Sequence, residues 1–203
     1  MRADAPRPSW IWPALVGLIA AAVYLNTLGN GYALDDVGIV RDNPHLGSLS
    51  GVPLLFARPY WPDASGAASG LYRPVALSTF AVDRALFGGS AAGAHAVNVA
   101  LHALASVLAW FALRRVATHY GTALLAALLF AVHPVHVEAV ANLVGRAELL
   151  AAAFVLAAWL CPPRPPGAST SGRAPAWGPG AAASYRLAGL SKETAGMAPL
   201  VFL

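Results

Sequence analysis

Residues 10–28 read WIWPALVGLIAAAVYLNTL, a run of nineteen residues without a charged side chain. Because a helix needs about 20 apolar residues to cross a hydrocarbon layer of about 30 Å, this stretch predicts a membrane-spanning helix. Two arginines precede it, as in a secretory signal peptide, but the run is longer than a signal core and no small-residue cleavage site follows. We therefore interpret it as a first span that stays in the chain, with Trp10 and Trp12 at one membrane interface and Tyr24 nearer the other.

Composition extends this conclusion to the whole chain of 203 residues. Hydrophobic residues make up 58% of it and charged residues only 11%, against roughly 25% charged residues in an ordinary soluble domain. These proportions argue against a disordered chain and against a water-soluble globule. The formal net charge of +4 comes from arginines scattered along the sequence, which argues against the clustered basic face of a nucleic-acid-binding protein. The single cysteine, Cys161, cannot form an intrachain disulfide.

Three more apolar stretches predict further spans, so that four are expected: residues 10–28, 94–113, 117–132 and 147–161. The third ends at His133-Pro134, because a proline disfavours helix in the residue before it. The fourth is short, but apolar residues at helical spacing precede it, which indicates an interfacial helix that leads into the span. The chain is therefore predicted to be all-α, a multi-pass transmembrane helical bundle with a large first external loop. Two short interfacial helices are expected in that loop, near 51–60 and 73–87.

The arginines predict how the bundle is oriented. If the four spans alternate, three groups of arginines fall on one side of the membrane: Arg2 and Arg7, Arg114 and Arg115, Arg164 and Arg173. By the positive-inside rule that side is cytoplasmic, which makes residues 1–9 a cytoplasmic N-terminus. The loop 29–93 and the segment 133–148 then face the periplasm, or the lumen in a eukaryote. Because they hold most of the acidic and histidine residues, any chemistry is expected on the external side.

The character of the sequence changes after the fourth span. Residues 162–180 are rich in Pro, Gly, Ser and Ala and predict a flexible linker. Residues 181–203 are interpreted as the start of further, truncated membrane segments, and the chain is expected to be a fragment. Within them, 181–190 is apolar but is interrupted by Arg186 and is too short to span by itself.

Two polar groups in the first external loop each admit two interpretations. Asp35-Asp36 is most simply a solvated turn or a helix cap. A carboxylate at a membrane face is also a suitable base for an acceptor hydroxyl when the other substrate is a lipid. Arg73, in Tyr72-Arg73-Pro74, either reaches from an interfacial helix toward the lipid headgroups or binds a lipid phosphate through its guanidinium fork.

Polar side chains also recur inside and beside the predicted spans. His95, Asn98 and His102 share one face of the second span, where we expect them to pack between helices rather than to ligate a substrate or a metal. The adjacent Lys192 and Glu193 are interpreted as a local ion pair at a helix end, which contributes little by itself.

The densest polar cluster is His133-Pro134-Val135-His136-Val137-Glu138, with Arg146 and Glu148 a short distance beyond it. His133, His136 and Glu138 lack the i, i+4 spacing of a helical histidine pair that binds a metal. A polar lid over an external cavity is therefore favoured over a metal site, and Arg146 is available there for an anionic group.

Taken together, several segments resemble the transmembrane and tetratricopeptide repeat-containing (TMTC) family of protein O-mannosyltransferases. The resemblance covers nearly all of residues 15–160, and its most specific part is the block from His-Pro-x-His-x-Glu-Ala-Val to Gly-Arg-Ala-Glu. The segments that carry it are YLNTL at 24–28 leading to Asp35-Asp36, YRP at 72–74, HAVN at 95–98 with His102, FAVHPVHVEAV at 130–140, VGRAELL at 144–150 and KE at 192–193.

The resemblance implies a GT-C type glycosyltransferase, a multi-helix membrane enzyme whose site opens on the external face. Its donor substrate would be a sugar on polyprenyl or dolichyl phosphate, its acceptor the Ser or Thr hydroxyl of a protein, and its sugar mannose. No further cofactor is implied, and a divalent metal is not indicated. Asp35 would be the base, with Asp36 supporting it. The residues implied in binding the donor phosphate or shaping its site are Arg73, Arg146, His133, His136, Glu138, Lys192 and Glu193.

The sequence departs from the family in lacking its 34-residue repeats. A membrane scaffold without catalysis is therefore the alternative. A small transporter, in which His95 and His102 relay protons, ranks last because no acidic residue lies within a clear span. The expected location is the bacterial inner membrane with a periplasmic site, or the endoplasmic reticulum membrane in a eukaryote.

Overall fold

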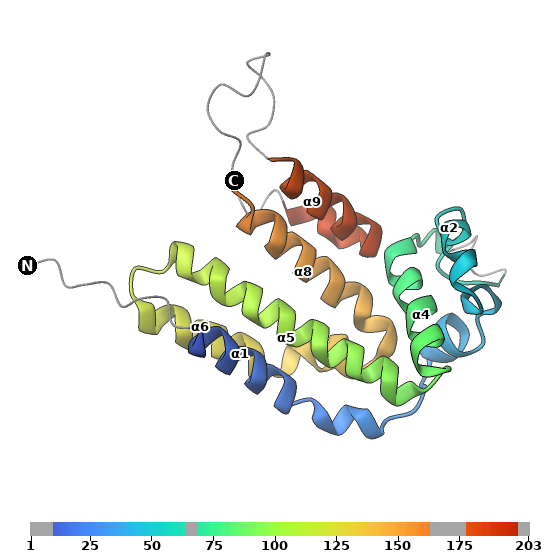
Figure 1. Cartoon of the computed structure of the whole chain (residues 1–203), viewed down its shortest axis with the longest axis horizontal. Coiled ribbons are helices and arrows are strands. Elements are labelled where there is room, and N and C mark those ends of the chain that lie inside the picture. Colours follow the sequence, from blue (N-terminus) through green and yellow to red (C-terminus); the bar gives the residue numbers. More distant parts are fainter. Residues whose placement is uncertain (1–9, 64–68, 163–177, 199–203) are drawn as a thin grey trace, which may run out of the picture.

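The computed structural model describes residues 10–63, 69–162 and 178–198, and within these ranges it contains helices and no strand (Figure 1). Three stretches are long and apolar enough to cross a membrane: Ile11–Gly29, Ala91–Val116 and Leu143–Leu160. A fourth is formed by Tyr120–Val132 and Pro134–Ala141 if the pair, bent by 41°, is one broken span. The prediction of an all-α, multi-pass helical bundle is confirmed.

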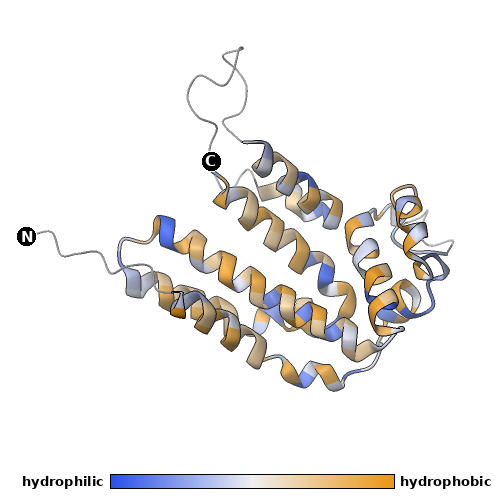
Figure 2. Cartoon of the chain, viewed as in Figure 1, coloured by the Kyte–Doolittle hydropathy of each residue, from blue (hydrophilic) through white to orange (hydrophobic). Residues whose placement is uncertain are grey.

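The bundle is built around one central helix. α5 (Ala91–Val116) packs against α1 (Ile11–Ala22), α6 (Tyr120–Val132) and α8 (Arg146–Leu160). Small side chains allow these close approaches. On α6 the alanines at every fourth position are fully buried, whereas Leu125 and Leu129 between them are exposed. In Figure 2 apolar residues cover much of the long helices, as expected for faces that contact lipid.

The helix ends follow local chemistry. α1 continues into a 3-10 turn, η1 (Leu25–Gly29), and α6 ends at His133, whose backbone is extended ahead of Pro134 as the proline rule predicts. The His133 ring then caps the next turn, η5 (Pro134–His136), by accepting a hydrogen bond from the Val135 N–H at 3.2 Å. Two more short turns lead into α8: α7 (Val137–Ala141) and η6 (Leu143–Gly145).

A further helix, α9 (Pro179–Ser191), packs along α8. It begins where α8 ends, because a Cβ at Gly180 would lie 3.4 Å from the Cys161 sulfur. It ends where α8 begins, because Lys192 pairs with Glu148. α9 is thus antiparallel to α8, although its 13 residues are fewer than a span requires. Of the predicted linker, 163–177 lies outside the described residues, and the first two residues of α9 belong to the predicted linker.

The first loop forms a separate small layer at one end of the bundle, where α2 and α4 stand together (Figure 1). The expected interfacial helices near 51–60 and 73–87 are represented by α2 (Val52–Leu55) and α4 (Pro74–Phe87). Short turns precede them: a π-helical turn η2 (Val37–Arg41), then η3 (Pro44–Leu46) and η4 (Leu49–Gly51). α4 ends at Gly88, whose φ of 62° is the left-handed conformation that glycine adopts easily. The largest buried cluster joins this layer to the start of α8, and its members include Ile39, Tyr60, Leu77, Phe80, Leu143 and Ala147.

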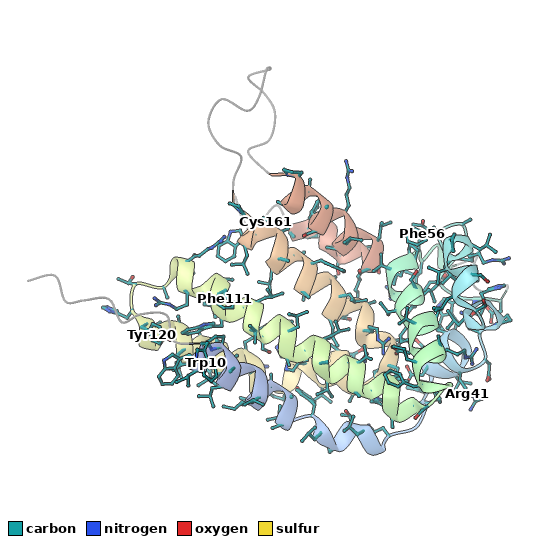
Figure 3. The ribbon with its side chains drawn as sticks, viewed as in Figure 1. Trp10, Arg41, Phe56, Phe111, Tyr120 and Cys161 are labelled. Atoms are coloured by element: carbon teal, nitrogen blue, oxygen red, sulfur yellow. The ribbon has the colours of Figure 1, made fainter. Side chains whose placement is uncertain are left out.

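The two ends of the bundle differ in character. Trp10, Tyr120 and Cys161 lie at one end and Arg41 and Phe56 at the other (Figure 3). At the first end, the Arg115 guanidinium donates to the last two carbonyls of α8, at 2.7 and 2.5 Å. Cations are favourable at a helix C-terminus, where carbonyl groups lack helical partners. The end that carries α2 and α4 is called the loop end below.

Candidate functional site

A cluster of four charged side chains lies at the loop end, where α4, α8 and α9 meet. The Arg73 guanidinium donates to both Glu193 oxygens, from Nε at 3.0 Å and from Nη2 at 2.5 Å. The Lys192 ammonium contacts Glu148 Oε1 at 2.5 Å. The prediction of a local Lys192–Glu193 pair is wrong. The backbone at Lys192 is extended (φ −156°, ψ 138°), so successive side chains point to opposite sides and reach two different helices.

The Tyr60 ring supports the Arg73 guanidinium. Pro74 begins α4, so Arg73 stands just outside the helix, and its guanidinium carbon lies 5.0 Å from the centre of the Tyr60 ring. Tyr60 is 2% exposed, and burial raises the pKa of its hydroxyl to about 12. A buried aromatic ring beneath a guanidinium attracts the cation and fixes its position. Tyr60 was not predicted as a site residue, because no local sequence pattern places that ring under an arginine thirteen residues later.

The two adjacent aspartates have different environments. Asp36 is buried, and its carboxylate accepts hydrogen bonds from the backbone N–H groups of Val144 at 2.9 Å and Ala33 at 3.3 Å. It thereby joins the first loop to the segment that begins α8. The Asp35 side chain is exposed and has no hydrogen-bond or ion-pair partner among the residues that the structure describes. The fixed Asp36 and the unpaired Asp35 agree with a supporting and an active carboxylate, a division of roles that stays a prediction.

The residue before Asp35 carries backbone strain. Leu34 has a φ of 48°, in the left-handed region, and its side chain is 89% exposed. A leucine in this conformation costs about 1–2 kcal/mol relative to ordinary backbone. Non-glycine residues are held there only where the surroundings impose it, and such positions gather at functional sites. Here the surroundings include the buried Asp36 two residues later, so the strained turn presents Asp35 to solvent.

An open pocket of about 640 Å³ lies beside this turn, between residues 29–36 and α7. Asp36 and Glu138 contribute its two carboxylates, and Leu34 lies on its wall. Asp35 is not a lining residue, but both of its neighbours are. The pocket wall is fixed by Tyr32, whose hydroxyl donates to the Gly89 carbonyl at 2.8 Å. The pocket therefore offers acidic groups to a ligand, in contrast to Arg73 and Lys192.

The histidines shape the bend after α6. His136 packs against Phe130, with ring centres 4.5 Å apart, and against His102, at 5.2 Å. His102 lies 2.9 Å, through Nε2, from the Ala131 carbonyl. His133 caps η5 and is itself exposed. Within 10–63, 69–162 and 178–198 no three His, Cys, Asp or Glu residues gather as candidate metal ligands.

The polar residues predicted to pack between helices do so. His95 Nε2 lies 3.4 Å from the Gly31 carbonyl. The Asn98 amide donates to three carbonyls between α7 and η6, at 3.1 to 3.3 Å. Together with His102 they connect the central helix to the segments that form the pocket.

Arg146 is not at the surface, contrary to the expectation that it is available for an anionic group. Its side chain is 0% exposed, and Nη1 lies 2.6 Å from the Asp83 carboxylate. The other guanidinium nitrogens donate to Asn98 Oδ1 at 2.7 Å and to the Ala94 carbonyl at 2.8 Å. Because an unpaired buried charge is costly, these partners bind Arg146 inside the bundle. It links α4, α5 and α8 beneath the site, and we do not retain it as a phosphate ligand.

The acidic pocket and the charged cluster both lie at the start of α8. The Val144 N–H binds the Asp36 carboxylate, and the Glu148 carboxylate binds Lys192. Val144 and Glu148 are four residues apart, which corresponds to a rise of only about 6 Å along a helix. Tyr60 belongs to the buried cluster that also contains Leu143 and Ala147 from this segment, and its ring lies 5.0 Å from the Arg73 guanidinium carbon. The structure therefore brings together, at one end of the bundle, the exposed Asp35 carboxylate, a pocket and the Arg73 guanidinium that pairs with Glu193.

Comparison with known proteins finds relatives that are named protein O-mannosyltransferases. The chain is 37% identical over 148 residues to the mouse protein O-mannosyltransferase TMTC3, a match that covers 72% of this chain and 16% of the mouse protein. It is 35% identical over 159 residues to human TMTC3, covering 77% and 17%. It is 38% identical over 141 residues to the Caenorhabditis elegans protein O-mannosyltransferase F38B6.6, covering 66% and 20%. The chain thus spans about a sixth to a fifth of the length of these relatives. No family profile and no solved structure matches it.

Proposed function

Since the chain belongs, over the part that aligns, to the TMTC family of protein O-mannosyltransferases, we propose that it contributes the acceptor-activating and donor-binding end of a membrane mannosyltransferase. The substrates would be mannose on a polyprenyl or dolichyl phosphate and a Ser or Thr hydroxyl of a protein. The observation that carries this proposal is the presence at one end of the bundle of the exposed Asp35 and the Tyr60-supported Arg73.

The proposed reaction uses the two groups in different ways. Asp35 accepts the proton of the acceptor hydroxyl as its oxygen attacks C1 of the mannose. The bond between C1 and the phosphate oxygen breaks, and its electron pair leaves with the polyprenyl phosphate. Arg73 stabilises the negative charge that develops on that phosphate, because a guanidinium fork matches two phosphate oxygens. Asp36 supports Asp35 by fixing the loop to the start of α8.

The pocket beside residues 29–36 suits the acceptor rather than the donor phosphate. Its carboxylates, Asp36 and Glu138, would repel an anion. A neutral peptide segment that carries a hydroxyl meets no such repulsion there. His133 and His136 shape the bend between α6 and α7, and α7 forms one wall of this pocket.

The location is proposed from the orientation of the bundle. Arg114 and Arg115 lie at the end opposite the site. By the positive-inside rule the site would face the periplasm at a bacterial inner membrane, or the lumen of the endoplasmic reticulum in a eukaryote. A lipid-linked donor embedded in that leaflet would reach Arg73 directly.

The test is the Asp35→Asn variant, assayed for mannose transfer from a polyprenyl-phosphate mannose to an acceptor protein in reconstituted membranes. Loss of a general base lowers the transfer rate by about 10²–10⁴-fold. The matched control is Asp42→Asn, the same change at an exposed carboxylate that pairs with Arg41. Full transfer by a correctly inserted Asp35→Asn protein would remove this residue from the mechanism, whereas no transfer by the unmodified chain would favour the non-catalytic scaffold.

A further inference from the structure

The guanidinium assigned above to the donor phosphate already holds a carboxylate. Glu193 receives two parallel hydrogen bonds from Arg73, from Nε and from Nη2. A carboxylate in this arrangement presents two oxygens to the fork, as a phosphate does. In this structure Glu193 therefore occupies the position in which Arg73 would bind a phosphate.

The charges of the cluster also match an exchange of Glu193 for a phosphate. Arg73 and Lys192 contribute two positive charges, and Glu193 and Glu148 two negative charges, so the cluster as a whole is neutral. A neutral cluster exerts little attraction on an anion. If Glu193 leaves, the remaining three side chains carry one net positive charge. A phosphodiester carries one negative charge, so it replaces the Glu193 carboxylate charge for charge.

Burial shows which partner is free to move. The Arg73 side chain is 13% exposed and rests on the Tyr60 ring, whereas the Glu193 side chain is 52% exposed. Glu193 also begins a short 3-10 turn, η7 (Glu193–Met197), rather than standing within a long helix. Its carboxylate reaches water by a side-chain rotation, while Arg73 stays where it is. An exposed partner of this kind contributes only weakly to folding stability.

We propose that Glu193 is a built-in competitor of the donor, which occupies the Arg73 fork until a lipid-linked phosphodiester exchanges with it. The inference rests on the proposed function, because it takes Arg73 as the donor-phosphate ligand. The exchange sets the apparent affinity for the donor, since part of the binding free energy is used to displace Glu193. Removing the charge of Glu193 must therefore strengthen binding, whereas a purely structural support of Arg73 would make the same change weaken it.

The experiment measures direct binding of farnesyl methyl phosphate, a lipid phosphodiester with one charge and no transferable sugar. The full chain is reconstituted in phosphatidylcholine nanodiscs at pH 7. We expect Glu193→Gln to tighten binding about three- to tenfold and Arg73→Gln to abolish it. The control Asp42→Asn breaks the other bidentate arginine–carboxylate pair, formed with Arg41, and leaves binding unchanged.

The outcomes distinguish failure of the proposed phosphate site from failure of the exchange alone. If Arg73→Gln binds the probe as well as the unmodified chain, the phosphate assignment of Arg73 fails and the exchange fails with it. If Arg73→Gln loses binding but Glu193→Gln binds equally or more weakly, the proposed phosphate site stands and the exchange is refuted. Adding phosphatidylglycerol distinguishes a donor site from a general headgroup site, because equal competition by that lipid overturns the donor assignment.

Discussion

Replacing Arg146 by methionine tests the buried charge pair beneath the site. Methionine fills much of the space of the arginine stem but leaves the Asp83 carboxylate, whose side chain is 9% exposed, without its 2.6 Å partner. Breaking such a pair from one side costs about 3–5 kcal/mol of folding free energy. A second route to the magnitude agrees, because protonating an ordinary carboxyl at pH 7 costs about 4 kcal/mol. We therefore expect Arg146→Met to lose about 3–5 kcal/mol.

The pH dependence of this loss has a defined sign. Burial raises the pKa of Asp83, and Arg146 offsets part of that rise. Without Arg146 the folded-state pKa lies further above the unfolded-state value, so the folded protein favours protonated Asp83. The penalty is then full at pH values above the folded-state pKa and disappears as the pH falls toward the unfolded-state value near 4. As the pH falls from 7 to 4, the difference in unfolding free energy between the unmodified chain and the variant should therefore become smaller.

The assay is equilibrium unfolding of the detergent-solubilised chain, compared among the unmodified protein, Arg146→Met and the double variant Arg146→Met with Asp83→Asn. The double variant removes both charges and should recover about half of the loss or more. A loss below about 1 kcal/mol in the single variant, or no recovery in the double variant, refutes the pairing argument. The folded double variant should still bind farnesyl methyl phosphate, and loss of that binding would contradict the placement of Arg146 outside the phosphate site.

Two further predictions address the surroundings of the site. Gly145→Ala should destabilise the chain by about 2–4 kcal/mol, because the new Cβ would lie 2.6 Å from two α7 carbonyl oxygens; thermal unfolding measures this, and unchanged stability would contradict the close approach. Tyr60→Leu should weaken donor-phosphate binding about three- to tenfold by removing the ring beneath Arg73, while Tyr60→Phe, which keeps the ring, should bind the probe as the unmodified chain does. Equal losses in both Tyr60 variants would show that the hydroxyl, not the ring, positions Arg73.

Patterns of neighbouring residues predicted the helices well. The absence of charges over 10–28 and 94–113 is a property of each stretch by itself, and each forms a helical segment whose large exposed side chains are apolar. The proline after His133 likewise ends α6 where expected, because its effect acts on the adjacent residue. The packing of Asn98 between helices followed from the cost of a polar group against lipid.

The candidate site was predicted by residue type but not by partner. Arg73 and the two aspartates were expected in one loop, and the structure brings them to one end of the bundle, while their roles stay predictions. Tyr60 was missed, since only the fold reveals a ring beneath a guanidinium. Arg146 was expected to be available to an anion because a polar cluster stands a few residues before it, whereas its partner Asp83 lies on another helix.

The sequence by itself therefore determined that this chain is an all-α membrane protein and which polar residues stand near the ends of its helices. Those properties depend on hydropathy and on neighbours a few residues apart. Only the tertiary structure decided which charges pair: Arg73 meets Glu193 across 120 residues, and Asp36 meets the Val144 N–H across 108. Such partners are selected by the packing of α4, α8 and α9, because a charge is stabilised by whatever group the fold brings within about 3 Å of it.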